Sequence, residues 1–162
     1  ALSPLFFIMN FKKTVVGLLQ VALDRNPSLF LIDLKIGPDN NIVVLLDGDE
    51  GVTLESCIAV SQQIEHNIDR EEHNFSLEVS SVGVGSALAI PRQYIKNIGR
   101  TLEVINLDDQ IFKGNLSKAN QEGITLEWKA REPKPVGKGK VTVTKTKKLA
   151  FASIKKAKVI IK

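Results

Sequence analysis

The sequence contains a single cysteine, Cys57, among 162 residues. One cysteine cannot form an internal disulfide, so the chain does not rely on the disulfide framework of small secreted domains. Cys57 also falls within a helical pattern of apolar residues, which favours a small buried thiol over a nucleophile. We therefore expect a protein of a reducing compartment, with a cytoplasmic location.

Long apolar runs are also missing near the start of the chain. The stretch Leu5–Met9 holds five apolar residues and is soon followed by Lys12 and Lys13. This is too short for the hydrophobic region of a signal peptide or for a membrane span, so we expect no membrane association. Met9 has the sequence context of a native start. We interpret residues 1–10 as an N-terminal extension and the part before Met9 as non-native.

The usual sequence signatures of catalysis do not occur. There is no phosphate-binding Gly-x-x-x-x-Gly-Lys loop, no Gly-x-Ser-x-Gly elbow and no His-Glu-x-x-His pair. Residues 82–86 hold two glycines after an expected strand, but the third glycine of a dinucleotide fingerprint is missing. We predict a binding protein rather than an enzyme, with no catalytic residue, bound metal or cofactor.

One acidic turn leaves an alternative open. Asp47, Asp49 and Glu50 are close in sequence, but an EF-hand loop starting at Asp47 would need glycine at its sixth position and glutamate at its twelfth, where valine and isoleucine stand. Thr53 is a natural N-cap, and carboxylates near a helix start are stabilised by the helix dipole. We favour a structural turn, and a small metal-dependent hydrolase that uses the three carboxylates is the alternative.

The first half of the chain reads as helix, strand, strand, helix, strand. Apolar residues recur at helical spacing before Pro27 and again over residues 54–68. Alternating patterns cover residues 30–36 and 75–80, and a continuous apolar run at 42–46 indicates a further strand. After the last strand, small residues that favour a turn follow one another: Ser80, Ser81, Gly83 and Gly85. We interpret them as an interdomain turn between an N-terminal α/β domain at 11–88 and a C-terminal domain at 89–162.

The charge changes sign near this boundary. Residues 1–90 hold 5 Lys and Arg against 12 Asp and Glu, a net charge of −7, whereas residues 91–162 hold 17 against 6, a net charge of +11. Such a division indicates a polyanionic partner for the second half. A cationic surface without a partner is the plainer alternative.

The second half begins with a short helical turn over residues 91–99, which carries Arg92 and Lys96 and is followed by Arg100. Five or six short apolar strands then follow in about seventy residues, a pattern typical of a small, strongly bent barrel. These strands are expected at 101–105, 111–116 and 124–128, with further alternation at Val141 and Val143, Leu149 and Phe151, and Val159 and Ile161.

A basic segment interrupts these strands. Residues 128–140 contain two prolines, two glycines and alternating lysines, so we predict a long, mobile hairpin loop there. A flexible cationic arm suits contacts to phosphates, although a loop that only aids solubility is the alternative. Its candidate RNA-binding or ribosome-binding residues are Lys129, Arg131, Lys134, Lys138, Lys140, Lys145, Lys147 and Lys148, and the helical turn adds Arg92, Lys96 and Arg100.

Several short motifs, taken in this order, resemble the bacterial ribosome maturation factor RimP family. They are the acidic turn with Gly-Val, Leu and Cys at 47–57, the segment 64–69, Leu77–Ser81 with Gly83, the turn at 94–99, and 154–157. The sequence departs from the family at two places. The family usually has proline where Val82 stands, and an acidic residue, a polar residue and proline where residues 85–87 are Gly-Ser-Ala.

The resemblance implies an α+β protein with a KH-like N-terminal domain and an SH3-like or Sm-like barrel after it. It further implies a non-catalytic role in maturing the small ribosomal subunit. The implied partners are the precursor of that subunit, its ribosomal RNA and a ribosomal protein, for which the family expectation is ribosomal protein twelve. We expect a monomer, and a protein-only adaptor with an inert basic loop is a further alternative.

Overall fold

The structure, a computed structural model, describes residues 4–83 and 85–160 of the chain. The chain forms two compact units, Ala1–Val82 and Gly83–Lys162. The first holds α1 (Pro4–Asp24), β1 (Leu29–Gly37), the 3-10 helix η1 (Pro38–Asn40), β2 (Asn41–Gly48), α2 (Leu54–Glu65) and β3 (Ser76–Ser81). The second holds α3 (Pro91–Lys96), β4 (Thr101–Asn106), β5 (Ile111–Ala119), β6 (Gly123–Pro133), β7 (Lys140–Ala150), the 3-10 helix η2 (Phe151–Ser153) and β8 (Ile154–Val159).

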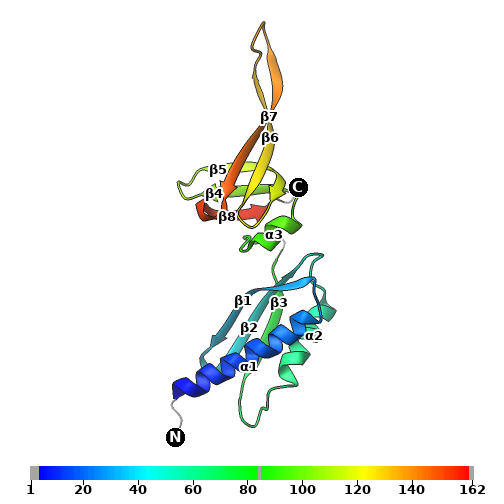
Figure 1. Cartoon of the computed structure of the whole chain (residues 1–162), viewed down its shortest axis with the longest axis vertical. Helices are drawn as coiled ribbons and strands as arrows, with labels where there is room; N and C mark the ends of the chain where they lie inside the picture. Colours follow the sequence, from blue (N-terminus) through cyan, green and yellow to red (C-terminus); the bar gives the residue numbers. More distant parts are fainter. Residues whose placement is uncertain (1–3, 84, 161–162) are drawn as a thin grey trace. The chain divides into compact units, whose positions relative to one another are not determined.

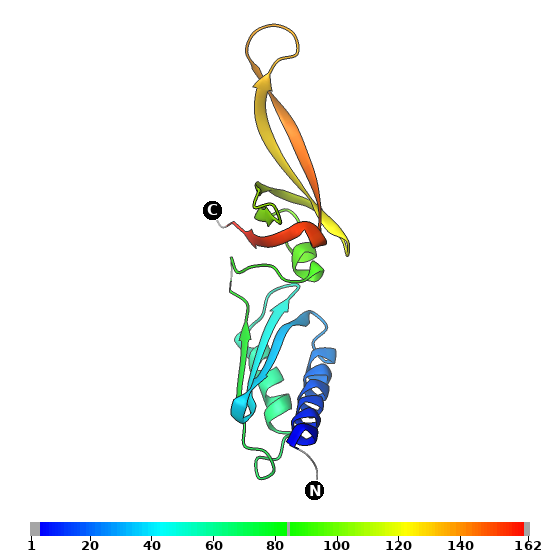
Figure 2. The same ribbon diagram turned by 90° about the vertical axis from the view of Figure 1, so that its left-hand side faces the viewer.

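The first unit is a three-stranded sheet with two helices on one face (Figure 2). β1 and β2 form an antiparallel hairpin, and β3 lies parallel to β2 after the chain has crossed over through α2. The helices cover the sheet because each has one apolar stripe, and Val15, Leu46 and Ile64 are fully buried where these elements meet. The predicted order of helix, strand, strand, helix, strand is confirmed.

The helix α1 begins at Pro4, upstream of the domain start expected at residue 11. Proline is compatible with the first turn of a helix because the amide it lacks would have no helical partner there. The backbone of residues 4–10, expected to form an extension, therefore continues α1. Residues 1–3 of the expected extension lie outside the described residues.

The second unit is built on a five-stranded antiparallel sheet with the order β7-β6-β5-β4-β8 (Figure 1). Irregularities in the pairing at Leu116/Lys118 and at Ile105/Asn106 mark bulges, which bend strands and raise their twist. The fully buried residues Leu102, Val104 and Leu126 form its core with their neighbours. The five strands agree with the expected number, and the expected strand residue Ile161 lies outside the described residues.

The prediction of a long mobile loop over residues 128–140 is wrong. The pairing of β6 with β7 extends from Gly123↔Ala150 to Pro133↔Lys140, so residues 134–139 alone connect the two strands. The β-branched run Val141–Thr144 favours an extended strand, and Pro133 stands at the strand end, where the absence of an amide donor costs least. A two-stranded ribbon therefore projects from the sheet of the second unit (Figures 1 and 2).

The turn after β3 starts later than expected. Ser80 and Ser81 pair with Leu45 and Leu46 as the last residues of β3. The chain then turns, with the Ser86 amide donating to the Gly83 carbonyl at 3.1 Å. Gly85 has φ of 81°, a left-handed conformation that glycine adopts at little cost. Val84 lies outside the described residues.

The two cores share no residue among those described, so a cavity in one should weaken that unit alone. Leu46→Ala, at a site with 0% exposure, should lower the free energy of unfolding of the first unit by about 2–5 kcal/mol. Far-ultraviolet circular dichroism follows α1 and α2 of this unit, and the fluorescence of Trp128, the single tryptophan, follows the second unit.

In urea, Leu46→Ala should shift the dichroism transition and leave the Trp128 transition in place. The matched variant Leu126→Ala, also at a site with 0% exposure, should do the reverse. Equal shifts of both probes in either variant would show that the units unfold together and would contradict the expectation.

Candidate nucleic-acid interface

The register of β6 against β7 assigns each ribbon residue to one of two faces, because directly paired residues of an antiparallel ladder lie on the same side. One face carries mostly threonines and cations, and we call it the threonine–lysine face. The opposite face continues the row that holds the buried Ile124 and Leu126, and we call it the valine face. The threonine–lysine face pairs Thr125 with Lys148, Glu127 with Thr146, Lys129 with Thr144, Arg131 with Thr142, and Pro133 with Lys140; the valine face pairs Trp128 with Lys145, Ala130 with Val143, and Glu132 with Val141.

Two of the eight predicted cations of this region lie on the valine face and interact with other side chains of the protein. Lys145 forms a salt bridge with Glu132 on the valine face. Lys147 is placed with its Nζ 5.5 Å from the centroid of the Phe112 ring, a cation–π contact. Each of these lysines therefore has a partner within the protein, and the sequence alone did not indicate these partners.

Arg131 is held across the ribbon on the threonine–lysine face. Its Nη1 donates to Thr142 Oγ1 at 3.0 Å and its Nη2 donates to the Lys140 carbonyl at 3.4 Å. A guanidinium has five N–H donors, so donors remain for a ligand while the group is held in place. Arg131 thus combines a restrained position with an exposed charge.

The remaining predicted cations of the ribbon are exposed. Within the described part of the chain, no side chain forms a salt bridge with any of them, and the one carboxylate on the threonine–lysine face is Glu127. They divide into the tip lysines, Lys134 and Lys138, and the lysines of the threonine–lysine face, Lys129, Lys140 and Lys148. A projecting element thus presents several uncompensated positive charges to solvent.

The helical turn α3 holds the other predicted cations, at the end of the second unit away from the ribbon (Figure 1). Tyr94, 3% exposed, anchors α3 on the core with its ring 4.9 Å from that of Phe151. Arg92 and Lys96 are half-buried and Arg100 is exposed. The structure therefore does not bring these three cations together with those of the ribbon, and they form a separate basic region.

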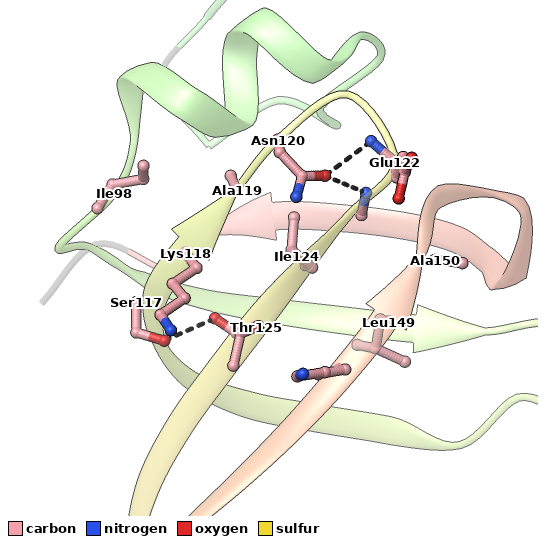
Figure 3. Close-up of a pocket in the computed structure, with 12 residues that line it drawn as sticks. Ile98, Ser117, Lys118, Ala119, Asn120, Glu122, Ile124, Thr125, Leu149 and Ala150 are labelled. Carbon is pink, nitrogen blue, oxygen red and sulfur yellow. Dashed lines mark hydrogen bonds between the residues drawn. The ribbon is translucent and has the colours of Figure 1, made fainter.

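An open groove lies where β5, β6 and β7 meet, with a volume of about 710 Å³ (Figure 3). Ser117 Oγ donates to the Thr125 carbonyl at 3.2 Å, and Asn120 Oδ1 accepts from the amides of Glu122 and Gly123 at 2.8 and 3.0 Å. Lys118 and Lys148 both line the groove. Sequence reasoning missed Lys118, because no motif marks it and only the fold, with the bulge in β5, places it across Thr125 from Lys148.

The acidic turn has the structural features that its sequence predicts. Thr53 caps α2, its Oγ1 accepting from the Ser56 amide at 3.1 Å. Asp47 is 5% exposed and its carboxylate accepts from the Gly48 amide at 2.8 Å. Among the described residues, no three His, Cys, Asp or Glu side chains are grouped as they would be to hold a metal ion.

Cys57, expected to be buried, is half-buried on α2, and burial raises the pKa of its thiol. This thiol therefore lacks the lowered pKa that activates a nucleophilic cysteine. None of the described helices is long and apolar enough to cross a membrane.

Comparison with known proteins identifies the family. Residues 17–85 match the family described as the RimP N-terminal domain. The ribosome maturation factor RimP of Christiangramia forsetii is 55% identical over 148 residues, which cover 91% of this chain and 96% of the relative. The chain belongs to the ribosome maturation factor RimP family. Its relatives named RimP include a Flavobacterium psychrophilum protein, 50% identical over 94% of this chain and 99% of its own, and one from Porphyromonas gingivalis, 37% identical over 79% and 84%.

The predicted resemblance to RimP is thus confirmed, and with it a role in ribosome maturation. The α+β class is confirmed as well, with a mixed first unit and an antiparallel five-stranded sheet in the second. The family assignment does not say which cations lie on the ribbon and which on α3; their positions come from the structure.

The anchor of α3 generates a prediction about alkaline pH. Burial raises the pKa of Tyr94, the single tyrosine, to about 12, from about 10 in an unfolded chain. Because the folded pKa is the higher one, this group's contribution to stability is complete below pH about 10 and is lost as pH rises towards about 12. Ultraviolet absorbance of the phenolate should therefore show one midpoint near 12, with stability in urea falling across the same interval.

Tyr94→Phe removes the phenol and should both abolish the absorbance change and flatten the alkaline fall in stability. A midpoint near 10 in protein that dichroism shows to be folded would contradict the buried position of Tyr94 and the anchoring of α3.

Proposed function

We propose that this protein is a non-catalytic factor that binds the precursor of the small ribosomal subunit. It contacts ribosomal RNA through the cationic second unit and a ribosomal protein through the five-stranded sheet of that unit, with ribosomal protein twelve as the expected partner. It acts as a monomer in the cytoplasm, where ribosomal subunits are assembled.

The observation that carries the RNA component is the projecting ribbon, whose exposed lysines include five with no salt-bridge partner among the described side chains. Lysine and arginine that neutralise RNA phosphates release condensed counterions, and this release supplies most of the affinity in sequence-independent binding. Residues 91–162 hold a net charge of +11, whereas residues 1–90 hold −7. The attraction to a polyanion therefore belongs to the second unit.

The pairing of the ribbon strengthens this proposal over that of an inert loop. Eleven Cα pairs join β6 to β7, so the cations of the threonine–lysine face keep fixed positions along it. Binding to an ordered element costs less conformational entropy than binding to a mobile loop, because the loop would have to become ordered when the complex forms. A merely solubilising segment would have no need of this order.

The domain names that the resemblance implies form part of the proposal. Two helices on one face of the three-stranded sheet support a KH-like first unit. The short, bulged antiparallel strands around one core support an SH3-like or Sm-like second unit. Sheets of this second kind leave their edges and connections available for a protein partner.

The RNA component can be tested with a variant in which Lys134, Lys138 and Lys140 are replaced together by Gln. Binding to purified small-subunit precursors should weaken, and the slope of log affinity against log salt should fall by about 0.7 to 0.9 for each phosphate that the variant no longer neutralises. The three side chains are exposed, so the free energy of unfolding should change by no more than about 0.5 kcal/mol.

The matched control replaces Lys12, Lys13 and Lys35, exposed lysines of the first unit, by Gln. It makes the same change in net charge and should leave the affinity and the salt slope close to those of the wild-type protein. Equal effects of the two triple variants would indicate that net charge alone matters. Wild-type binding that survives nuclease treatment and high salt would favour the protein-only adaptor.

A further inference from the structure

We infer that the threonine–lysine face of the ribbon is a binding face for the sugar–phosphate backbone of double-stranded RNA, and that the exposed hydroxyls of Thr144 and Thr146 are part of it. The valine face does not take part. This inference rests on the proposed function and deepens it, because it divides the basic residues by face and adds two uncharged side chains to the site.

Hydroxyls lie beside cations across the two strands of this face. Along β7, successive side chains of one face are roughly 6.6–6.8 Å apart, and each has a direct cross-strand neighbour at roughly 4.5–5.5 Å between Cβ atoms. Thr144 lies opposite Lys129, and Thr142 lies opposite Arg131. Each of these cations therefore has a threonine hydroxyl beside it. Thr146, the next threonine of the same face, lies opposite its one carboxylate, Glu127.

The hydrogen-bonding groups of this face suit both the phosphates and the sugars of RNA. Lysine and arginine only donate hydrogen bonds, which suits phosphate oxygens, whereas a threonine hydroxyl both donates and accepts. The ribose 2′-hydroxyl of RNA also donates and accepts, and it is the group by which proteins distinguish RNA from DNA. A face that places hydroxyls beside cations can thus contact both the phosphates and the sugars of an RNA strand.

The two faces of the ribbon differ in their charged side chains. On the valine face, the charge of Lys145 is offset by Glu132, and the neighbouring side chains are Ala130, Val141 and Val143. On the threonine–lysine face, Lys129 and Lys140 are exposed and have no salt-bridge partner among the described side chains. The threonine–lysine face as a whole holds four cations and one carboxylate, Glu127, whereas the valine face holds two lysines and Glu132. A polyanion that approaches the ribbon is therefore attracted more strongly to the threonine–lysine face.

The side chains on this face favour a duplex over a single strand. Single-stranded RNA is held chiefly by stacking of bases on aromatic rings. Neither the threonine–lysine face nor residues 134–139 contain an aromatic side chain, and Trp128 lies on the valine face. Duplex RNA instead presents phosphates and 2′-hydroxyls across a wide, shallow minor groove, which proteins read largely without regard to sequence.

A pair of matched double variants tests the inference in the full chain. Thr144→Val with Thr146→Val removes two hydroxyls from the threonine–lysine face and keeps β-branched side chains. Val141→Thr with Val143→Thr makes the reverse change on the valine face. Binding is measured by fluorescence anisotropy with an RNA hairpin, a DNA hairpin of the same sequence and a single-stranded RNA, and thermal unfolding confirms that both variants fold.

The threonine double variant should bind the RNA hairpin about two- to tenfold more weakly, as expected when one or two neutral hydrogen bonds are removed, and should bind the DNA hairpin as the wild type does. The valine-face variant should match the wild type on all three ligands. Lys129→Gln should weaken binding to both hairpins and lower the salt slope, whereas Lys145→Gln should change neither.

Several results would overturn the inference. Equal losses of affinity from both double variants would remove the division by face, equal losses on RNA and DNA would remove the role of the 2′-hydroxyl, and tighter binding of the single strand would remove the preference for a duplex. In each case the proposed function would still stand if the protein bound small-subunit precursors in a salt-dependent way and if the triple variant of Lys134, Lys138 and Lys140 bound them more weakly. If the wild-type protein did not bind the precursors at all, the proposed function itself would be rejected.

Discussion

The pairing of β6 with β7 is the constraint on which the candidate site depends. The first part of this pairing, from Gly123 to Glu127, belongs to the five-stranded sheet and places Leu126 in the core. The second part, from Trp128 to Pro133, forms the end of the ribbon that projects from the sheet. Because side chains alternate along a strand, a slip of one residue would exchange the two faces and move the threonines to the core side. The register is held at its base by close packing, since a Cβ added to Gly123 would lie 2.3 Å from the Leu149 carbonyl oxygen.

The two units carry net charges of opposite sign, so we expect only the second unit to be attracted to RNA. The first unit is net negative and has a helix-covered sheet with its own core. Of the 17 Lys and Arg of the second unit, 11 lie on the ribbon or on α3 and the adjoining Arg100. In the proposed complex, electrostatic attraction would orient the second unit towards the RNA before any specific contact forms.

The sequence predicted the first unit well because its elements carry strong local signals. Helical spacing of apolar residues, the alternation in residues 30–36 and the Thr53 cap each report on a few neighbouring residues. The ribbon was missed because Pro133, Pro135, Gly137 and Gly139 indicate a loop, and the alternation of valine and threonine after them was too short to outweigh that signal. The division of its cations depends on long-range register, which no local pattern contains, and the position of Lys118 in the groove depends on a bulge.

In the proposed complex with a small-subunit precursor, the ribbon lies against ribosomal RNA, and a cryo-electron microscopy map of that complex would show whether it does. We expect the threonine–lysine face to lie against the backbone of an RNA helix and the valine face to be turned away from it. A map in which the ribbon extends into solvent, or rests on protein alone while the rest of the second unit is bound, would contradict this expectation.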